Sequence, residues 1–232
     1  VTDLPGPEQS PTVLTVILNW RTAEMTLKSV EAAEVAMQGI AGGIVVVDND
    51  SGDGSFERMS AALKDRPRIR VVQSGRNGGF GAGNNVGIRL GLPGGVRPDY
   101  VYILNSDAFP APDAIRLLRD YMERHPKVGL AGSYIHGPDG EPHTTCFRFP
   151  SAASEFEAAA RTGPVSRVLA KRTVRMDLPE VSGPVDWLAG ASLMIREAVV
   201  RSVGTFDEAF FLYFEETDLC RRAAEGGWPT HF

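Results

Sequence analysis

The sequence predicts an α/β protein built around a largely parallel sheet, and its 232 residues suffice for one sizeable core or two small domains. Short apolar runs rich in β-branched residues alternate with segments of helical apolar spacing. Such alternation is typical of βαβ units, and ligands then bind beyond the carboxyl ends of the strands. The apolar runs are Thr12–Leu18, Gly43–Val47, Val71–Val72 and Tyr100–Leu104.

The elements follow one another in a regular order. Helical spacing predicts helices at Met25–Met37, Phe56–Leu63 and Phe80–Leu90, each placed between two of the apolar runs. In the second half we expect a helix at Asp113–Arg124 and strands at Val128–Tyr134 and Val185–Ile195. A final helix is expected within Phe210–Glu225 and ends at a glycine pair. Pro138–Glu141 predicts a hairpin turn, and Ser151–Asp177 a helix or a mobile loop.

Composition excludes several classes of protein. The net charge of −5 argues against a nucleic-acid partner, which usually requires a basic stripe. Residues 1–11 are polar and proline-rich, so we expect a flexible terminus rather than a signal peptide. No apolar run reaches the roughly 18–20 residues of a membrane span. The two cysteines are expected to be free thiols in a reducing cytoplasm. A chain that begins with Val and stops abruptly at Phe232 suggests a fragment of a longer protein.

The segment Asp48–Gly54 (DNDSGDG) directly follows the second strand. Its carboxylates and amide could contact a nucleobase, a ribose or a metal. A calcium loop is excluded, because that spacing would put Ser60 where a bidentate Glu is required. A polar turn that caps the next helix through Asp53 or Ser55 is the simpler alternative.

The segment Arg76–Gly87 is rich in glycine and leads from the third strand into a helix. Glycines let the backbone approach an anion, and a helix N-terminus offers free N–H groups. The dinucleotide fingerprint G-x-G-x-x-G is not met from Gly79 or from Gly81. Close packing of helix on sheet would explain the glycines equally well.

Carboxylates mark two further segments. Asp107, in Asn105–Asp107, leaves a strongly apolar strand and could coordinate Mg²⁺ or Mn²⁺, although the tripeptide is also a common turn. The run Phe210–Cys220 delivers Glu215, Glu216 and Asp218 to the start of a helix behind an aromatic stretch. Acidic residues there complement the helix dipole, but an apolar surrounding also favours the raised pKa of a general base.

The ordered set of motifs resembles family-2 glycosyltransferases, and among them bacterial rhamnosyltransferases of cell-surface polysaccharide assembly. The resemblance covers residues 12–228 and lies in VILNWR, VVDNDSGDGS, NGGFGAGNNVGI, YILNSD, WLAGASLMIREAVV and GTFDEAFFLYFEETDLCRRAAEGGW. It implies a GT-A fold, with a Rossmann-like nucleotide-binding sheet and a mixed acceptor-side half. Residues 12–232 would form one domain, with a nucleotide-binding part at about 12–110 and a catalytic part at about 111–232.

The resemblance also implies roles for individual residues. Glu216 would be the catalytic base, with Glu215 and Asp218 as its neighbours, and Asp107 would bind the metal next to Asn105, which replaces the first acid of a D-x-D motif. Asp48–Asp50 also spells D-x-D but lies at the wrong strand for this motif. His231 is a further candidate for the metal, although the expected position lies slightly beyond Phe232. The residues expected to contact the donor are Asn19, Asp48, Asp50, Arg76, Asn77, Gly78, Asn84, Asn105, Trp187 and Gly190.

The implied reaction is a single displacement that moves a sugar, rhamnose in the subgroup resembled, from a nucleoside diphosphate to a hydroxyl. A Mg²⁺ or Mn²⁺ ion would assist departure of the diphosphate, and the acceptor would be a glycan or a lipid-linked glycan. These partners are compatible with peripheral association at the cytoplasmic face of the membrane. Two alternatives stay open at this point: a nucleotidyltransferase, and a non-catalytic module that binds a nucleotide or a sugar.

Overall fold

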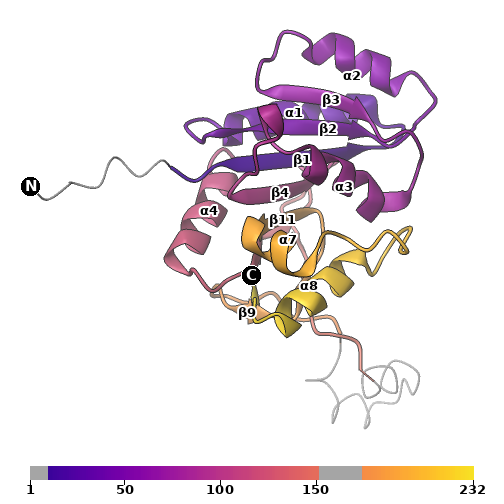
Figure 1. Cartoon of the computed structure of the whole chain (residues 1–232). Helices are drawn as coiled ribbons and strands as arrows, with labels where there is room; N and C mark the ends of the chain where they lie inside the picture. Colours follow the sequence, from indigo (N-terminus) through magenta and orange to yellow (C-terminus); the bar gives the residue numbers. More distant parts are fainter. Residues whose placement is uncertain (1–9, 152–173) are drawn as a thin grey trace, which may run out of the picture.

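The computed structural model describes residues 10–151 and 174–232. An eight-stranded sheet with the order β3-β2-β1-β4-β11-β5-β12-β9 passes through the whole molecule (Figure 1). Its first four strands along the chain are all parallel to one another. They are β1 (Val13–Asn19), β2 (Gly42–Asp48), β3 (Ile69–Gln73) and β4 (Tyr100–Asn105). The predicted parallel sheet is therefore confirmed.

The other half of the sheet is mixed. Strand β11 (Ser192–Arg196) runs antiparallel to β4 and to β5 (Leu130–Gly132). Strand β12 (Thr230–His231) is parallel to β5, and β9 (Pro184–Val185) is antiparallel to β12. This arrangement confirms the fold class expected from the sequence.

Helices cover both faces of the sheet (Figure 1). On one face α1 (Ala23–Ala36), α2 (Ser55–Leu63) and α4 (Ala114–Arg124) pack over a core that includes Val30, Met59 and Met122. On the other face lie α3 (Gly79–Leu90), α7 (Glu197–Val203) and α8 (Glu215–Glu225). Alternate side chains of the buried strands enter the two cores, which is why these strands read as continuous apolar runs.

One predicted strand was wrong in extent. The segment Val185–Ile195 is divided among β9, β10 (Trp187–Leu188) and β11. Strand β10 leaves the main sheet and pairs with β8 (Cys146–Phe147), and the chain then turns at Gly190 to enter β11. An apolar pattern cannot show that successive residues pair in different sheets, so the sequence suggested one strand.

The remaining elements agree with expectation. Strands β6 (Ile135–His136) and β7 (Pro142–His143) form the hairpin around the predicted turn. Helix α8 ends at Glu225, and Gly227 has a left-handed φ of 83°. Both cysteines are buried and free, as predicted. The expected helix or loop at Ser151–Asp177 and the expected flexible terminus at 1–11 lie mostly outside the described residues.

Candidate active site

The candidate site lies at the carboxyl edge of the parallel strands. Asn19 and Asp48 end neighbouring strands in register, and Leu18 pairs with Asn105 on β4. A cavity of about 380 Å³ opens at this edge. It is lined by Leu18, Trp20, Thr22, Asn49, Asn77, Gly79, Phe80, Asn105, Ser106, Asp107, Phe211 and Leu212. Four of the polar segments singled out from the sequence therefore meet at one place, as the parallel topology requires.

Asn19 and Asp48 form a buried network below the cavity. The Asn19 amide donates to Asp48 Oδ1 at 2.8 Å, and its oxygen accepts from Thr26 Oγ1 at 2.7 Å. Asp48 also accepts from the hydroxyl and the backbone N–H of Ser51. Both side chains are fully buried, and neither lines the cavity. Their contacts fix the loop that follows β2, and direct contact with a nucleoside stays a prediction.

Asn49, which the sequence did not single out as a site residue, lies between these buried residues and the cavity. It is 3 % exposed, and its amide donates to Asn77 Oδ1 at 3.0 Å and to the Gly79 carbonyl at 3.1 Å. Its oxygen has no hydrogen-bond partner among the described residues. An unpaired buried acceptor at a cavity wall can receive a donor from a ligand. Asp50, beside it, is exposed and has a left-handed φ of 56°.

The glycine-rich segment packs against the segment that leads into α8. Gly79 has a φ of 89°, and a Cβ there would lie 1.9 Å from the Phe211 carbonyl oxygen. Phe80 N–H donates to that same oxygen at 2.9 Å. Gly78, at the N-terminus of α3, has a lesser constraint, because an added Cβ would lie 2.8 Å from the Ala82 Cβ. Gly79 therefore allows its backbone to approach the Phe211 carbonyl, and Gly78 leaves room for the Ala82 side chain.

Arg76 and Asn84 do not line the cavity. The exposed Arg76 side chain lies 3.4 Å from Glu208. Asn84 is fully buried within α3, where its amide donates to the Phe80 carbonyl, and its oxygen has no partner among the described residues. The neighbouring Asn85 holds the chain before α8, because it both donates to and accepts from the Phe206 backbone. Roles for Arg76 and Asn84 in nucleotide binding stay predictions.

Asn105 and Asp107 do line the cavity, and the Asp107 carboxylate is exposed. The Asn105 N–H donates to the Ala191 carbonyl at 3.1 Å, which ties the exit of β4 to the turn around Gly190. Within the described residues no group of three or more His, Cys, Asp or Glu side chains could hold a metal by itself. Among the described acidic residues, Asp107 alone lines this cavity.

The acidic pair at the start of α8 is largely buried. Glu216 Oε1 accepts the Gly190 backbone N–H at 3.1 Å. Burial, followed by the negative charge of Glu215, raises the pKa of Glu216 above its usual value. Glu215 is 1 % exposed, its Oε2 has no partner among the described residues, and burial likewise raises its pKa. Two carboxyl groups with raised pKa values therefore lie side by side at this edge.

Asp218 has a different environment. Both Nε and Nη2 of Arg222 lie 2.7 Å from its Oδ2, one helical turn further along α8. Arg222 also donates to the Thr205 carbonyl, so the pair connects α8 to the segment that follows α7. The Asp218 carboxylate is therefore engaged by Arg222, whereas Glu216 has no such cationic partner among the described residues.

Two residues expected at the site lie elsewhere. The Trp187 ring stacks on Phe147 with centroids 4.2 Å apart, and its Nε1 donates to the Arg148 carbonyl. It does not line the cavity. His231 contacts Tyr121 of α4, with 2.8 Å between Nδ1 and the hydroxyl, at the middle of the sheet rather than at its carboxyl edge. His231 does not line the cavity, and its role as a metal ligand stays a prediction. His125, His136 and His143 are exposed.

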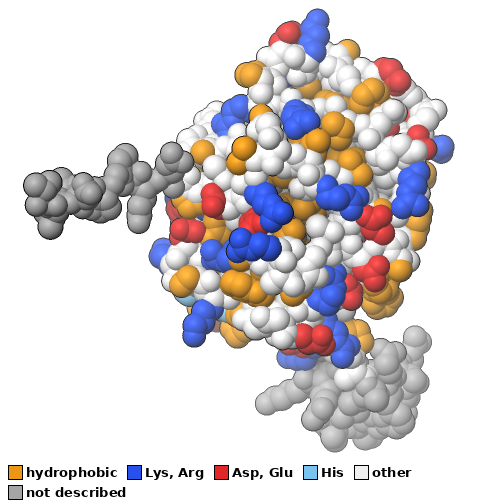
Figure 2. Space-filling view, viewed as in Figure 1, with side chains coloured by type: hydrophobic (Ala, Val, Ile, Leu, Met, Phe, Trp, Pro, Cys, Tyr) orange, Lys and Arg blue, Asp and Glu red, His pale blue; other side chains and the backbone are white. Residues whose placement is uncertain are grey.

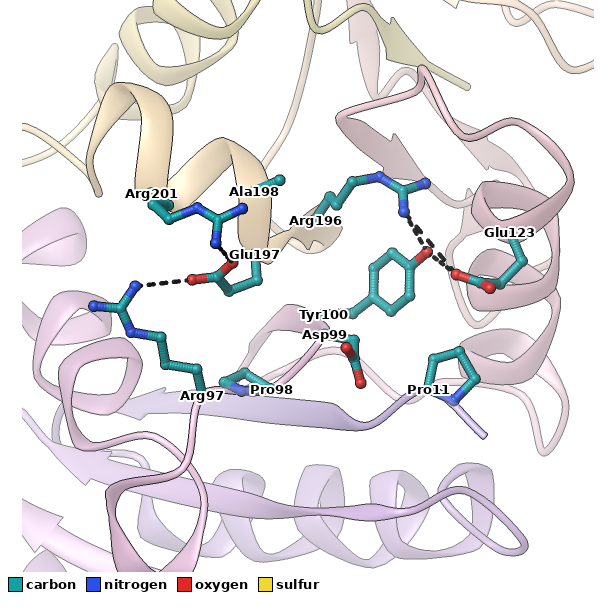
Figure 3. Close-up of a pocket in the computed structure, with 10 residues that line it drawn as sticks. All are labelled: Pro11, Arg97, Pro98, Asp99, Tyr100, Glu123, Arg196, Glu197, Ala198 and Arg201. Atoms are coloured by element: carbon teal, nitrogen blue, oxygen red, sulfur yellow. Dashed lines mark hydrogen bonds and ion pairs between the residues drawn. The ribbon is translucent and has the colours of Figure 1, made fainter. Parts of the chain in front are cut away.

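A second cavity, of about 480 Å³, lies at the opposite edge of the sheet (Figure 3). Its charged groups pair with one another: Arg97 contacts Glu197 at 3.1 Å, and Arg196 donates to the Tyr100 hydroxyl at 2.8 Å. Tyr100 donates in turn to Glu123, and Figure 3 shows these side chains pointing toward one another. The charged side chains around this cavity therefore bind one another, and their contacts join α4, α7 and the start of β4.

The arrangement of strands and helices defines a fold of the GT-A type, and solved structures agree with this class. A mannosyltransferase from Pyrobaculum calidifontis, solved with GDP-mannose and Mn²⁺, matches with a TM-score of 0.63. The match covers 98 % of this chain and 56 % of that one, at 16 % identity. Staphylococcus aureus TarS, residues 1–349, matches with a TM-score of 0.60 over 91 % of this chain and 55 % of its own, at 13 % identity. These likenesses confirm the fold.

The sequence model described as Glycosyl transferase family 2 matches residues 25–190, so the chain belongs to glycosyltransferase family 2. An N-acetylglucosaminyl-diphospho-decaprenol L-rhamnosyltransferase of Mycobacterium tuberculosis is 32 % identical over 195 residues, which are 80 % of this chain. Rhamnosyltransferase WbbL of Escherichia coli is 26 % identical over 157 residues, which are 66 % of this chain. The aligned part spans 62 % and 57 % of these two relatives. The family expected from the sequence is therefore confirmed.

Proposed function

We propose that the chain transfers a sugar from a nucleoside-diphosphate sugar to an acceptor hydroxyl, with inversion at the anomeric carbon. The observation that carries this proposal is the Glu216 carboxyl, whose pKa is raised and whose Oε1 is held by the Gly190 N–H. An added Gly190 Cβ would lie 3.0 Å from the Phe80 ring, and Phe80 lines the cavity. Glu216 therefore lies close to the Phe80 ring, which lines the space in which a donor would bind.

The donor would occupy the cavity, with its diphosphate near Asp107 and the exit of β4. Mg²⁺ is commonly held by one or two carboxylates together with substrate phosphates, rather than by a full set of protein ligands. One exposed carboxylate and the Asn105 side chain at the same wall fit that pattern. When bound, Mg²⁺ or Mn²⁺ would neutralise charge on the departing diphosphate. We propose Asp107 as its carboxylate ligand, with Asn105 beside it.

In the reaction, Glu216 would accept the proton of the acceptor hydroxyl. The hydroxyl oxygen forms a bond to the anomeric carbon while the bond from that carbon to the diphosphate oxygen breaks. A general base of this kind is most effective when its pKa lies near the working pH, which burial beside Glu215 favours. The Gly190 N–H would keep the carboxylate in one orientation. Residues 12–232 would supply both the donor side and the catalytic side as one domain.

The acceptor and the sugar are suggested by the relatives. Two of them are rhamnosyltransferases, and one of these is named for N-acetylglucosaminyl-diphospho-decaprenol. We propose a rhamnosyl or related hexosyl donor and a glycan acceptor attached to a lipid, without a nucleic-acid partner. The enzyme would act in the cytoplasm, at the inner face of the membrane. None of the helices in the described ranges is long and apolar enough to cross a bilayer.

Release of free nucleoside diphosphate from a panel of UDP-, dTDP- and GDP-sugars tests this function. We expect release that depends on Mg²⁺ or Mn²⁺ and on Glu216, with slow donor hydrolysis as the readout where no acceptor is present. A nucleotidyltransferase would instead release pyrophosphate when it is given a nucleoside triphosphate and a sugar 1-phosphate, and a binding module would release nothing in either assay. Either result would overturn the proposal, and the family membership favours neither.

A further inference from the structure

Exposed aromatic side chains gather at one edge of the molecule. Within the described residues there are six whose exposed fraction is half or more: Trp20, Phe109, Tyr134, Phe211, Tyr213 and Phe214. The first three follow β1, β4 and β5, and the others directly precede α8. All six therefore belong to the edge that carries the cavity. Exposed apolar groups gathered in this way mark an interaction surface rather than ordinary scatter.

Four consecutive residues dominate this edge, and we call Phe211–Phe214 the aromatic loop. Their exposed fractions are 60 %, 54 %, 72 % and 59 %. In Figure 2, hydrophobic side chains appear at the right margin of the molecule, where Figure 1 places the segment that leads into α8. Exposure of four bulky apolar side chains to water is unfavourable in free energy. Other contacts must therefore stabilise this conformation, or the exposed surface serves to bind a partner.

The backbone holds the aromatic loop in a strained conformation. Tyr213 and Phe214 have φ values of 68° and 74°, a left-handed region that bulky side chains seldom adopt. The hydrogen bond from Phe80 N–H to the Phe211 carbonyl fixes the start of the loop on α3. Strain at two successive aromatic residues is retained where surrounding structure imposes it, and often serves function. Here it keeps the aromatic side chains at the surface.

The aromatic loop is continuous with the cavity. Phe211 and Leu212 line the cavity together with Trp20. Next to Trp20, the Arg21 guanidinium lies 5.1 Å from the indole ring and forms no ion pair with any described carboxylate. An apolar cluster with Trp, Tyr and an unpaired cation has the composition of surfaces that enter the interface of a bilayer.

We propose that the aromatic loop and Trp20 dock the enzyme on a lipid bilayer and hold the cavity against its headgroups. This inference rests on the proposed function, in which the acceptor is attached to a lipid. Phe211, Leu212 and Phe214 carry no side-chain hydrogen-bonding group, so the Tyr213 hydroxyl and the Trp20 indole N–H are the hydrogen-bonding groups of this surface. A surface built to bind the sugar part of the acceptor would require more donors and acceptors beside its aromatic rings. A bilayer interface requires only apolar area and tolerates the neighbouring cation.

The test is sedimentation of the full chain with vesicles of phosphatidylcholine, alone or mixed with phosphatidylglycerol. The test variant is Tyr213→Asn with Phe214→Asn, because Asn tolerates a left-handed φ and neither residue lines the cavity. The control is Val96→Asn with Leu117→Gln, which removes two exposed apolar side chains that lie outside the aromatic loop and do not line the cavity. We expect the test variant to bind vesicles about tenfold or more weakly, and the control to bind as the wild type does.

Nucleoside-diphosphate binding, measured without vesicles, keeps this inference separate from the proposed function. Both double variants should bind the nucleotide as the wild type does, whatever the vesicle result. A wild-type chain that sediments with neither kind of vesicle would overturn the docking surface. Equal vesicle binding by the test variant and the wild type would overturn it as well. Absence of nucleotide binding in the wild type would instead count against the proposed function alone.

Discussion

The Gly190 backbone N–H donates a hydrogen bond to Glu216 Oε1 at 3.1 Å. This contact joins the turn between β10 and β11 to the first turn of α8. Because Gly190 has no Cβ, Glu216 can approach its backbone closely. The bond stabilises the charged form of a carboxyl group that burial otherwise disfavours. The turn between β10 and β11 thus orients the carboxyl group of Glu216, which belongs to α8.

Gly190→Ala is expected to impair catalysis more than stability. A Cβ at this position would lie 2.7 Å from Glu216 Oε1 and 3.0 Å from the Phe80 ring, so the base must move. We expect kcat for donor turnover to fall by about 10- to 100-fold, since small displacements of a catalytic group have effects of this size.

Gly183→Ala is the matched control, because an added Cβ there meets nothing closer than 3.9 Å. It should turn over the donor as the wild type does. Equal kcat for Gly190→Ala and the wild type would show that the turn does not position the base.

Glu215→Gln is expected to change the pH dependence of stability. A buried carboxyl group with a raised pKa favours the folded state when it is protonated. Its contribution is therefore full below the usual pKa of Glu and is lost as the pH rises through the raised pKa. The amide cannot ionise, so the variant should be more stable than the wild type at pH 8 by on the order of 1 kcal/mol.

Urea unfolding at a series of pH values measures this difference, which should shrink below about pH 4.5, the ordinary pKa range of Glu. A constant difference between the two proteins from pH 4 to pH 8 would show that Glu215 does not titrate as its burial implies.

Asp107→Asn is expected to weaken metal-dependent binding of a nucleoside diphosphate and to leave the fold intact. The substitution removes one charge from the cavity wall with little change in shape, and the carboxylate is exposed. Titration calorimetry with UDP, dTDP and GDP, each with and without Mn²⁺, checks this. Asp50→Asn is the control for a nearby exposed acid at a different strand. Unchanged affinity for Asp107→Asn with a loss for Asp50→Asn would move the metal ligand to Asp50.

Arg196→Ala is expected to destabilise the fold by about 2–3 kcal/mol. Its guanidinium donates to the Tyr100 hydroxyl (Figure 3). It also donates to the carbonyls of Val128 and Met122, so its removal leaves three largely buried acceptors without this donor. Arg201→Ala is the control, since that side chain is mostly exposed and lies 3.9 Å from Glu197. Urea unfolding that shows equal losses for both would contradict the assigned role of Arg196.

Much of the fold was predictable because strand and helix periods are local. The buried strand Tyr100–Asn105 and helix α4 agree with the predicted elements to within a residue. The division of Val185–Ile195 was not predictable, because pairing with β8 depends on a segment about 40 residues away. Parallel topology also predicted correctly that the segments of Asp48 and Asp107 converge at one edge.

The candidate site was predicted less completely, since side-chain contacts decide it. The pairing of Asp218 with Arg222 follows from an i, i+4 spacing on one helix and could have been inferred. Asn49 was visible within its polar segment, but its place at the cavity wall depends on Asn77 and Gly79. The burial of Asn19 and Asp48 could not be read from residue type, because polar side chains at strand ends are usually exposed.

The central claim is that Glu216 is the base, and turnover by Glu216→Gln tests it most directly. The amide keeps the shape of the side chain and can still accept from the Gly190 N–H, so donor binding should be nearly unchanged. Removal of a general base typically lowers the rate by about 10²- to 10⁴-fold, and we expect kcat to fall within that range. Asp218→Asn should lose less, because Asp218 is paired with Arg222. Near-normal turnover by Glu216→Gln beside an inactive Asp218→Asn enzyme would contradict the assignment.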